Sequence, residues 1–188
     1  MAKRAPGVQA EIDEVRALYR KAWMCWGMFA TGLLAVCWLG MAYVNWRDEG
    51  FRQRIPAEAE AGKAIYVGGE FGLRGGCVVA IFALAPDAQT RLHASGLRAL
   101  RDAQSSHSRV TRRSIDANWQ ETPYVWPEGE SRYEDYWAYG ISCAWIDAGR
   151  YRTIRAALEQ PGSFYRMLDE GAVLVIPSAG IVAYVYAD

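Results

Sequence analysis

The sequence predicts an α+β protein in which a single N-terminal transmembrane helix precedes a ferredoxin-like (split βαβ) sheet with two helices on one face. Two observations support this prediction. An uncharged stretch of 25 residues lies near the N-terminus, and the segments after it follow the order strand, helix, strand, strand, helix, strand, strand. Each half of that order holds one strand–helix step of similar length, as a split βαβ unit does. A different α+β sandwich fits the same order and is the alternative.

Composition narrows the class of protein. Of the 188 residues, 52% are hydrophobic and 22% are charged, which is not the composition of a disordered chain. The 21 basic residues equal the 21 acidic ones, so the chain lacks the positive field that general nucleic-acid binding needs. Four cysteines are too few for a disulfide-based scaffold. We therefore expect a folded protein with no nucleic-acid partner.

Residues 22–46 carry no charge and predict the transmembrane helix. A helix of this length spans roughly 37 Å, which exceeds a hydrocarbon core of about 30 Å. Trp23 and Trp26 at one end, with Tyr43 and Trp46 at the other, form the aromatic belt expected at headgroup level. The alternative is a cleaved signal peptide, but its apolar region is about 7–15 residues long and precedes a small-x-small cleavage site. An uncleaved signal anchor fits the sequence better.

The charges that flank this helix predict its orientation. Five basic residues lie within twenty positions before it, and four lie within twenty after it: Lys3, Arg4, Arg16, Arg20 and Lys21 against Arg47, Arg52, Arg54 and Lys63. The positive-inside rule then favours a cytoplasmic N-terminus. The size and the anchor-plus-domain layout suggest a bacterial protein of the inner membrane, with its C-terminal domain in the periplasm.

Small residues recur on one face of the helix. Gly27, Thr31 and Ala35 are four positions apart, a spacing that lets two membrane helices approach closely. Self-association of the chain through this stripe is therefore an expectation, and a homo-oligomer would be its result. Cys25 and Cys37 lie in the same apolar stretch and are interpreted as inert small hydrophobic residues.

The chain divides into four predicted segments. Residues 1–21 form a short cytoplasmic N-terminal helix, and 22–46 cross the membrane. Residues 47–76 form a juxtamembrane linker and a Gly-rich loop, since five glycines occur between positions 68 and 76. Residues 77–188 form the extracytoplasmic α+β domain.

The first half of that domain begins with an apolar run at 77–85, which is typical of a strand buried on both faces. Pro86 is tolerated in the first turn of a helix and opens one over 86–104. Residues 109–119 alternate between charged and apolar side chains, as an edge strand does. A loop rich in proline, acids and aromatic residues follows at 120–134.

The second half repeats the pattern. Residues 135–146 predict a second strong strand. Asp147 is a plausible N-cap for a helix over 148–159, which Pro161 and Gly162 would end. The apolar segments 172–177 and 181–187 are separated by a short turn and predict a hairpin.

Cys77 and Cys143 fall on the two strands that would be central neighbours in this fold. An oxidising compartment could join them in a disulfide. However, aligning the strands by their helices offsets the two cysteines by about 13 Å, whereas a disulfide needs Cα atoms within about 7 Å. Two buried free thiols are therefore the alternative.

Chemical motifs are scarce in the sequence. The two histidines, His93 and His107, belong to no zinc-binding pattern, and the Gly-rich stretch lacks the ending of a phosphate loop. Gly140–Ala144 lacks the fifth-position glycine of a nucleophile elbow. We therefore assign no catalytic residue, metal or cofactor, and the sequence favours a protein that is not an enzyme.

The region 119–139 invites a functional hypothesis because large aromatic residues gather there among prolines and acids. Such rings are enriched at protein interfaces and can also stack on sugars. Alternatively, they cover the open end of the sheet or meet the bilayer surface. The candidate partner- or ligand-binding residues are Trp119, Tyr124, Trp126, Tyr133 and Trp137.

These observations predict a bitopic membrane-anchored protein whose domain makes protein contacts as an accessory or assembly part of a cell-envelope complex. The partners would be the lipid bilayer, through residues 22–46, and a membrane or periplasmic protein. One alternative is a sensory domain that binds a glycan or small ligand. Another is a membrane-tethered hydrolase that uses the carboxylates of the loop.

Overall fold

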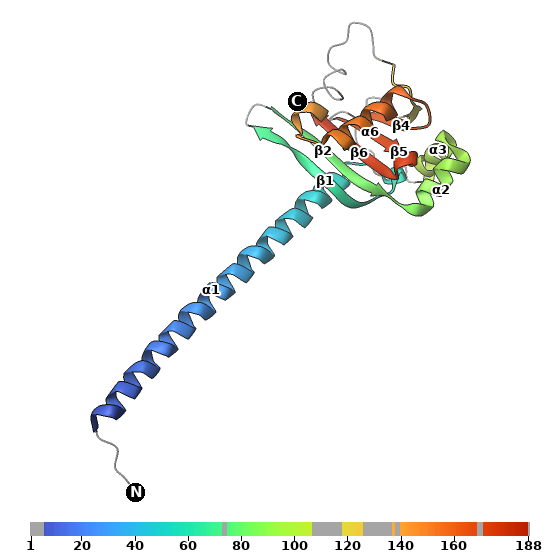
Figure 1. Cartoon of the computed structure of the whole chain (residues 1–188). Coiled ribbons are helices and arrows are strands. Elements are labelled where there is room, and N and C mark those ends of the chain that lie inside the picture. The colour runs from blue at the N-terminus through green and yellow to red at the C-terminus, as the bar shows by residue number, and fades with distance from the viewer. Residues whose placement is uncertain are drawn as a thin grey trace. The chain divides into compact units, whose positions relative to one another are not determined.

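The computed structural model describes residues 6–72, 75–106, 118–125, 137, 140–168 and 171–187. The chain forms two compact units, Met1–Arg47 and Asp48–Asp188. One continuous helix, α1 (Pro6–Arg52), begins in the first unit and ends in the second. The predicted N-terminal helix, membrane span and start of the linker are therefore parts of a single element (Figure 1).

The part of α1 from Tyr19 to Arg52 is long and apolar enough to cross a membrane or to act as a signal sequence. In the most apolar 18-residue stretch of this part, no residue is buried in the protein. Its large apolar side chains are exposed, and those of Trp26, Leu34 and Trp38 are at least 65% exposed, so the protein itself does not cover this surface.

The second unit holds a six-stranded sheet. Its strands are β1 (Ala61–Gly72), β2 (Gly75–Leu84), β3 (Gln120–Glu121), β4 (Phe164–Leu168), β5 (Gly171–Ile176) and β6 (Ile181–Ala187). Their order across the sheet is β1-β2-β6-β5-β4-β3, and every neighbouring pair is antiparallel. Its helical elements are η1 (Ala57–Ala59), α2 (Pro86–Ser95), α3 (Leu97–Ser106), α5 (Gly140–Cys143), α6 (Ala148–Glu159) and η3 (Pro177–Ala179). The α+β class is thereby confirmed.

The predicted ferredoxin-like topology is not observed. In a split βαβ unit, one other strand lies between the strand before the helix and the strand after it. Among the described residues, the next strand after α2 and α3 is β3, and β6, β5 and β4 separate it from β2. Strands β4, β5 and β6 form a meander, and this meander lies in the middle of the sheet, between β2 and β3.

Helices cover both faces of the sheet, whereas the prediction placed two on one face. On one face, α5 and α6 pack over Val79 and Ile81 of β2. On the other, the end of α1, η1, α2 and α3 pack over Val78, Ala80 and Phe82. Because the run 77–84 is apolar at consecutive positions, each face of β2 needs its own covering layer. The sheet is consequently the middle layer of three.

Several predicted elements are confirmed. A helix begins at Pro86, although Gly96, with φ +55°, divides the predicted helix 86–104 into α2 and α3. Asp147 caps α6, which ends at Glu159. β5 and β6 form the predicted hairpin, in a register that runs from Ala172 opposite Val185 to Ile176 opposite Ile181.

Other segments differ from the prediction. Residues 61–72, expected to be linker and Gly-rich loop, form β1. Gly69 lets the backbones of β1 and β2 approach each other closely, because a Cβ at that position would lie 2.0 Å from the Cys77 carbonyl oxygen. The predicted strand 135–146 is wrong over 140–143, where the chain forms helix α5. A Cβ at Gly140 would lie 2.6 Å from a Val185 methyl group, so the glycine lets this helical turn pack on β6. The apolar run alone cannot distinguish a buried turn of helix from a strand.

Two further differences concern the second half of the sheet. The prediction contained no strand at β4, which lies directly after the loop that ends α6. The short strand β3 occupies the start of the expected loop 120–134. The predicted edge strand 109–119 lies outside the described residues except for its last two positions.

Candidate functional site

The described aromatic residues of the 119–139 region are core residues. Trp119, Tyr124 and Trp137 are 0%, 8% and 1% exposed. The Tyr124 ring contacts those of Trp137 and Tyr165 edge-on, with centroids 6.1 and 5.0 Å apart, whereas Trp119 packs on the opposite face of the sheet. Trp126 and Tyr133 lie outside the described residues. The three described rings thus fill both cores and do not form a surface for a ligand or partner.

A buried cluster of polar groups surrounds Trp119. Glu58 in η1 and Arg166 in β4 form an ion pair with a distance of 2.6 Å, and the Trp119 indole N–H donates to the same Glu58 oxygen at 3.2 Å. The side chains of Glu58 and Arg166 are only 4% and 1% exposed. This buried charge pair joins η1, in the layer that covers the sheet, to β4 of the sheet, which is a structural role.

The structure pairs Cys77 with Cys143 in a disulfide, with Cα atoms 6.3 Å apart. The predicted register offset does not apply, because Cys143 ends helix α5 and does not lie on a neighbouring strand. That helix packs directly on β2, which carries Cys77. Cys25 and Cys37 are free cysteines on exposed positions of α1.

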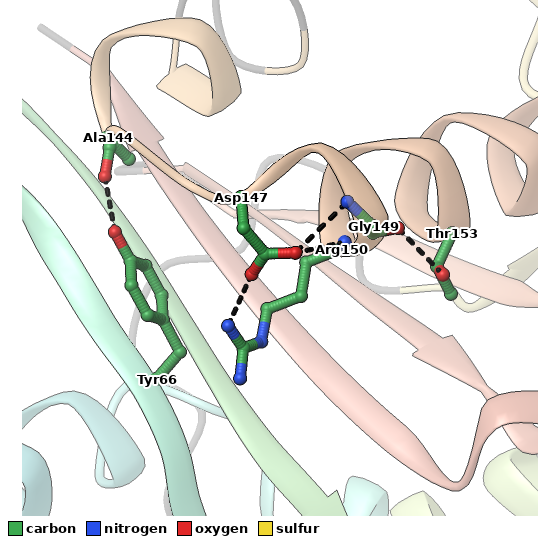
Figure 2. Close-up of polar contacts among 6 residues, drawn as sticks. All are labelled: Tyr66, Ala144, Asp147, Gly149, Arg150 and Thr153. Atoms are coloured by element: carbon green, nitrogen blue, oxygen red, sulfur yellow. Dashed lines mark hydrogen bonds and ion pairs between the residues drawn. The ribbon is translucent and has the colours of Figure 1, made fainter.

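A polar surface cluster lies where the α5–α6 connection meets β1; we call it the Trp145 corner, formed by Tyr66, Glu70, Trp145 and Arg150. The Tyr66 hydroxyl donates to the Ala144 carbonyl oxygen at 2.6 Å, which ties β1 to the connection (Figure 2). The Arg150 guanidinium lies 5.5 Å from the centre of the Tyr66 ring, a cation–π contact. Both interactions hold the connection against the sheet edge.

Trp145 is the most exposed aromatic side chain described in the second unit, at 78%. Its backbone is left-handed, with φ +54°, a conformation that is uncommon for a bulky residue. Its indole N–H donates to Glu70 Oε1 at 3.0 Å. The ring is therefore fixed at one edge while its faces remain open to solvent.

Asp147 sets the direction in which α6 leaves this corner. One of its oxygens accepts the backbone N–H groups of Gly149 and Arg150, each at 3.0 Å, and the other accepts from the Arg150 guanidinium (Figure 2). The Arg150 backbone N–H is the main cause that lowers the pKa of Asp147, and the Arg150 guanidinium adds to it. The Thr153 hydroxyl donates to the Gly149 carbonyl oxygen in the next turn.

The small-residue stripe of α1 is exposed along its length. The Thr31 hydroxyl donates to the Gly27 carbonyl oxygen at 2.5 Å, so its polar group is satisfied within the helix. Gly27 and Ala35 expose no polar side chain. The stripe thus offers a smooth surface of the kind that the sequence predicted for helix contacts.

Sequence reasoning missed the Trp145 corner. Trp145 lay inside the predicted strand 135–146, and Glu70 lay in the predicted loop. The contact between them joins positions 75 residues apart, so no spacing in the sequence signals it.

Among the described residues, no three His, Cys, Asp or Glu side chains form a group that could hold a metal ion. Comparisons of the chain with protein-family models, with curated proteins and with solved structures found no match. The function must therefore be argued from the geometry above.

Proposed function

We propose that the chain is a single-pass protein of a bacterial inner membrane, with its N-terminus in the cytoplasm and its α+β domain in the periplasm. Two observations support this location. Residues 22–46 form an uncharged part of α1 with aromatic side chains at both ends. The Cys77–Cys143 disulfide is consistent with an oxidising compartment outside the cytoplasm.

The domain makes protein contacts as an accessory or assembly part of a cell-envelope complex. The observation that carries this proposal is the state of Trp145, which is exposed, held in a left-handed backbone and fixed by Glu70. Such a backbone costs of order 1–3 kcal/mol and persists only where surrounding contacts impose it. Tryptophan is also the residue type most enriched among interface hot spots. A pre-positioned indole is a suitable anchor for a partner protein.

The contact residues in this proposal differ from those of the initial hypothesis. Trp145 takes the central role, because Trp119, Tyr124 and Trp137 are buried. Trp126 and Tyr133 stay predictions from the sequence. Glu70 acts by orienting the indole of Trp145.

A glycan or small ligand is the second candidate, because an indole with open faces can also stack on a sugar ring. The two candidates differ in what binds to the Trp145 corner. Titration of the full-length protein with glycans would quench the fluorescence of Trp145 if the second candidate is right. A partner protein would instead be recovered with the chain from membranes.

The test is cross-linking and affinity purification of the full-length, tagged chain from detergent-solubilised membranes. Trp145→Ala should lose a partner that the wild-type chain recovers. Tyr151→Ala is the matched control, since Tyr151 is an exposed aromatic residue (41%) six positions along the chain, in α6, and it should keep the partner. Recovery of the chain alone, or equal recovery with Trp145→Ala, would contradict the proposal.

The location has its own test. Full-length chains that carry a reporter fused to the C-terminus, active only outside the cytoplasm, should be active. A reporter of the opposite kind should be inactive at the same position. The reverse pattern would show that the domain lies in the cytoplasm.

A further inference from the structure

Three consecutive residues at the end of α5 and the start of the α5–α6 connection are each held to β1 or β2. Their contacts are the disulfide of Cys143, the hydrogen bond that the Ala144 carbonyl oxygen accepts from Tyr66 (Figure 2), and the hydrogen bond that Trp145 donates to Glu70. The covalent contact therefore lies two positions before the exposed indole of the Trp145 corner.

The residues that hold Cys143 and Trp145 are neighbours across the two strands. Glu70 of β1 lies directly opposite Cys77 of β2 in the antiparallel register. Side chains at directly opposite positions point to the same face and have Cβ atoms about 4.5–5.5 Å apart. Cys143 and Trp145 thus contact adjoining positions on one face of the sheet. The disulfide consequently sets where the connection lies relative to Glu70.

The noncovalent contacts of Trp145 are weaker restraints. Ile141 and Ala144 pack α5 on the core, but a helix of four residues is not stabilised by its own backbone hydrogen bonds. The hydrogen bond from Trp145 to Glu70 is exposed to water, where such a bond contributes little net free energy. The left-handed backbone of Trp145, with φ +54°, is unfavourable for a bulky side chain. The disulfide is therefore the restraint that keeps the indole in place.

We propose that oxidation of Cys77 and Cys143 assembles the Trp145 corner, so that the chain can bind its partner only after the domain has reached an oxidising compartment. This inference rests on the function proposed above for Trp145. In the reduced chain, the indole leaves Glu70 and the left-handed backbone relaxes. In the oxidised chain, the bridge holds the connection in the geometry that presents the indole. The two cysteines are thus positioning residues for the contact residue, under redox control.

The oxidant is a protein disulfide, and the reaction is two successive thiol–disulfide exchanges. Cys143 is partly exposed, whereas Cys77 is 1% exposed, so the Cys143 thiolate attacks the oxidant first. This attack forms a mixed disulfide and releases one thiolate of the oxidant. The Cys77 thiolate then attacks Cys143 Sγ, which forms the bridge and releases the second thiolate. The chain loses two electrons and two protons, and the oxidant gains them as a dithiol.

Fluorine NMR of the full-length chain in detergent tests the proposal without a partner. The chain carries fluorotryptophan in a Cys25→Ser/Cys37→Ser background, and Trp145→Phe and Trp119→Phe identify two signals. Reduction with a dithiol should move the Trp145 signal to the shift of a freely solvated indole, whereas the buried Trp119 should keep its shift. An unchanged Trp145 signal after complete reduction would overturn the proposal. A simultaneous loss of the Trp119 shift would also overturn it, because the disulfide would then support the whole fold.

Partner recovery from membranes separates this proposal from the proposed function. Cys77→Ser/Cys143→Ser should recover about tenfold less partner than the wild type, as loss of an interface anchor does, and Cys25→Ser/Cys37→Ser is the matched control with full recovery. Equal recovery by both variants, with a partner that still needs Trp145, would overturn the proposal. A Trp145 signal that responds to reductant, with recovery that ignores Trp145→Ala, would support redox control of the indole and refute only the proposed contact.

Discussion

Glu58 and Arg166 form an ion pair inside the protein, with Glu58 Oε1 2.6 Å from Arg166 Nη1 across 108 positions of sequence. The pair joins η1, which follows the end of α1, to β4 in the far half of the sheet. The indole N–H of Trp119 donates to the same carboxylate oxygen. Because both charges are removed from water, each depends on the other for compensation.

Glu58→Gln should therefore be strongly destabilising. The substitution leaves the Arg166 guanidinium buried without its counter-charge, which should lower the free energy of unfolding by about 3–5 kcal/mol. Denaturant titration of the full-length chain in detergent measures the loss. Glu60→Gln is the matched control, because Glu60 pairs with Arg91 at the surface and such pairs contribute at most about 1 kcal/mol. Equal losses in the two variants would contradict this account.

The Cys77–Cys143 disulfide should contribute to stability and should be present in the protein made by cells. Cys77→Ser/Cys143→Ser should lower the free energy of unfolding by about 2–5 kcal/mol. Cys25→Ser/Cys37→Ser removes the two free cysteines of α1 and should leave that value unchanged. Thiol labelling of the unfolded wild-type chain should modify only two cysteines until a reductant is added. Labelling of all four before reduction would show that the bridge does not form.

Asp147 should make stability depend on pH. Its pKa is lowered in the folded protein, chiefly by the backbone N–H of Arg150 and also by the Arg150 guanidinium, so its charged form stabilises the fold. This contribution is fully present above the ordinary value of 3.8 and is lost as the pH falls through that value toward the lower folded pKa.

Asp147→Asn isolates the charge, because asparagine is also a good N-cap. The wild-type chain should melt at a higher temperature than this variant at neutral pH, and the difference should disappear in acid below the folded pKa. The difference should be small beside the effect of Glu58→Gln. A difference in melting temperature that stays constant across this pH range would exclude the charge as its cause.

The proposed insertion of α1 into a membrane can be tested at the centre of residues 22–46. Leu34→Arg places a charge in the middle of residues 22–46 and should disfavour insertion by about 2.5–3.5 kcal/mol. The fraction of full-length chain that stays with membranes after an alkaline wash should fall, whereas Leu34→Val should match the wild type. An N-terminal tag should remain on the wild-type chain. Its loss during export would identify the helix as a cleaved signal sequence.

Local chemistry explains which elements the sequence could predict. Asp147 caps a helix through N–H groups two and three residues away, and Pro86 starts one because its fixed φ suits a first turn. The hairpin of β5 and β6 joins two apolar runs across a short turn. Each of these features involves neighbours along the chain, so a local pattern is sufficient to predict it.

Non-local contacts explain what was missed. The sequence placed Gly69 in a loop and Gly140 in a strand. In the structure, Gly69 lies directly against Cys77 and Gly140 directly against Val185, where a side chain would not fit. Three residues of the predicted aromatic site, Trp119, Tyr124 and Trp137, lie in the cores because of contacts with distant segments. Trp145, which is exposed, lies within the apolar segment 135–146 that the sequence predicted to be a strand.

The amino-acid order alone was enough to establish an apolar helix of membrane-spanning length and an α+β class, since both follow from runs and periods of neighbouring residues. The strand order, the two covered faces, the Glu58–Arg166 pair and the contact between Trp145 and Glu70 were decided only when distant segments packed together. The physical reason is that close approach, burial and charge pairing depend on which segments become neighbours in space, and a linear pattern does not contain that information.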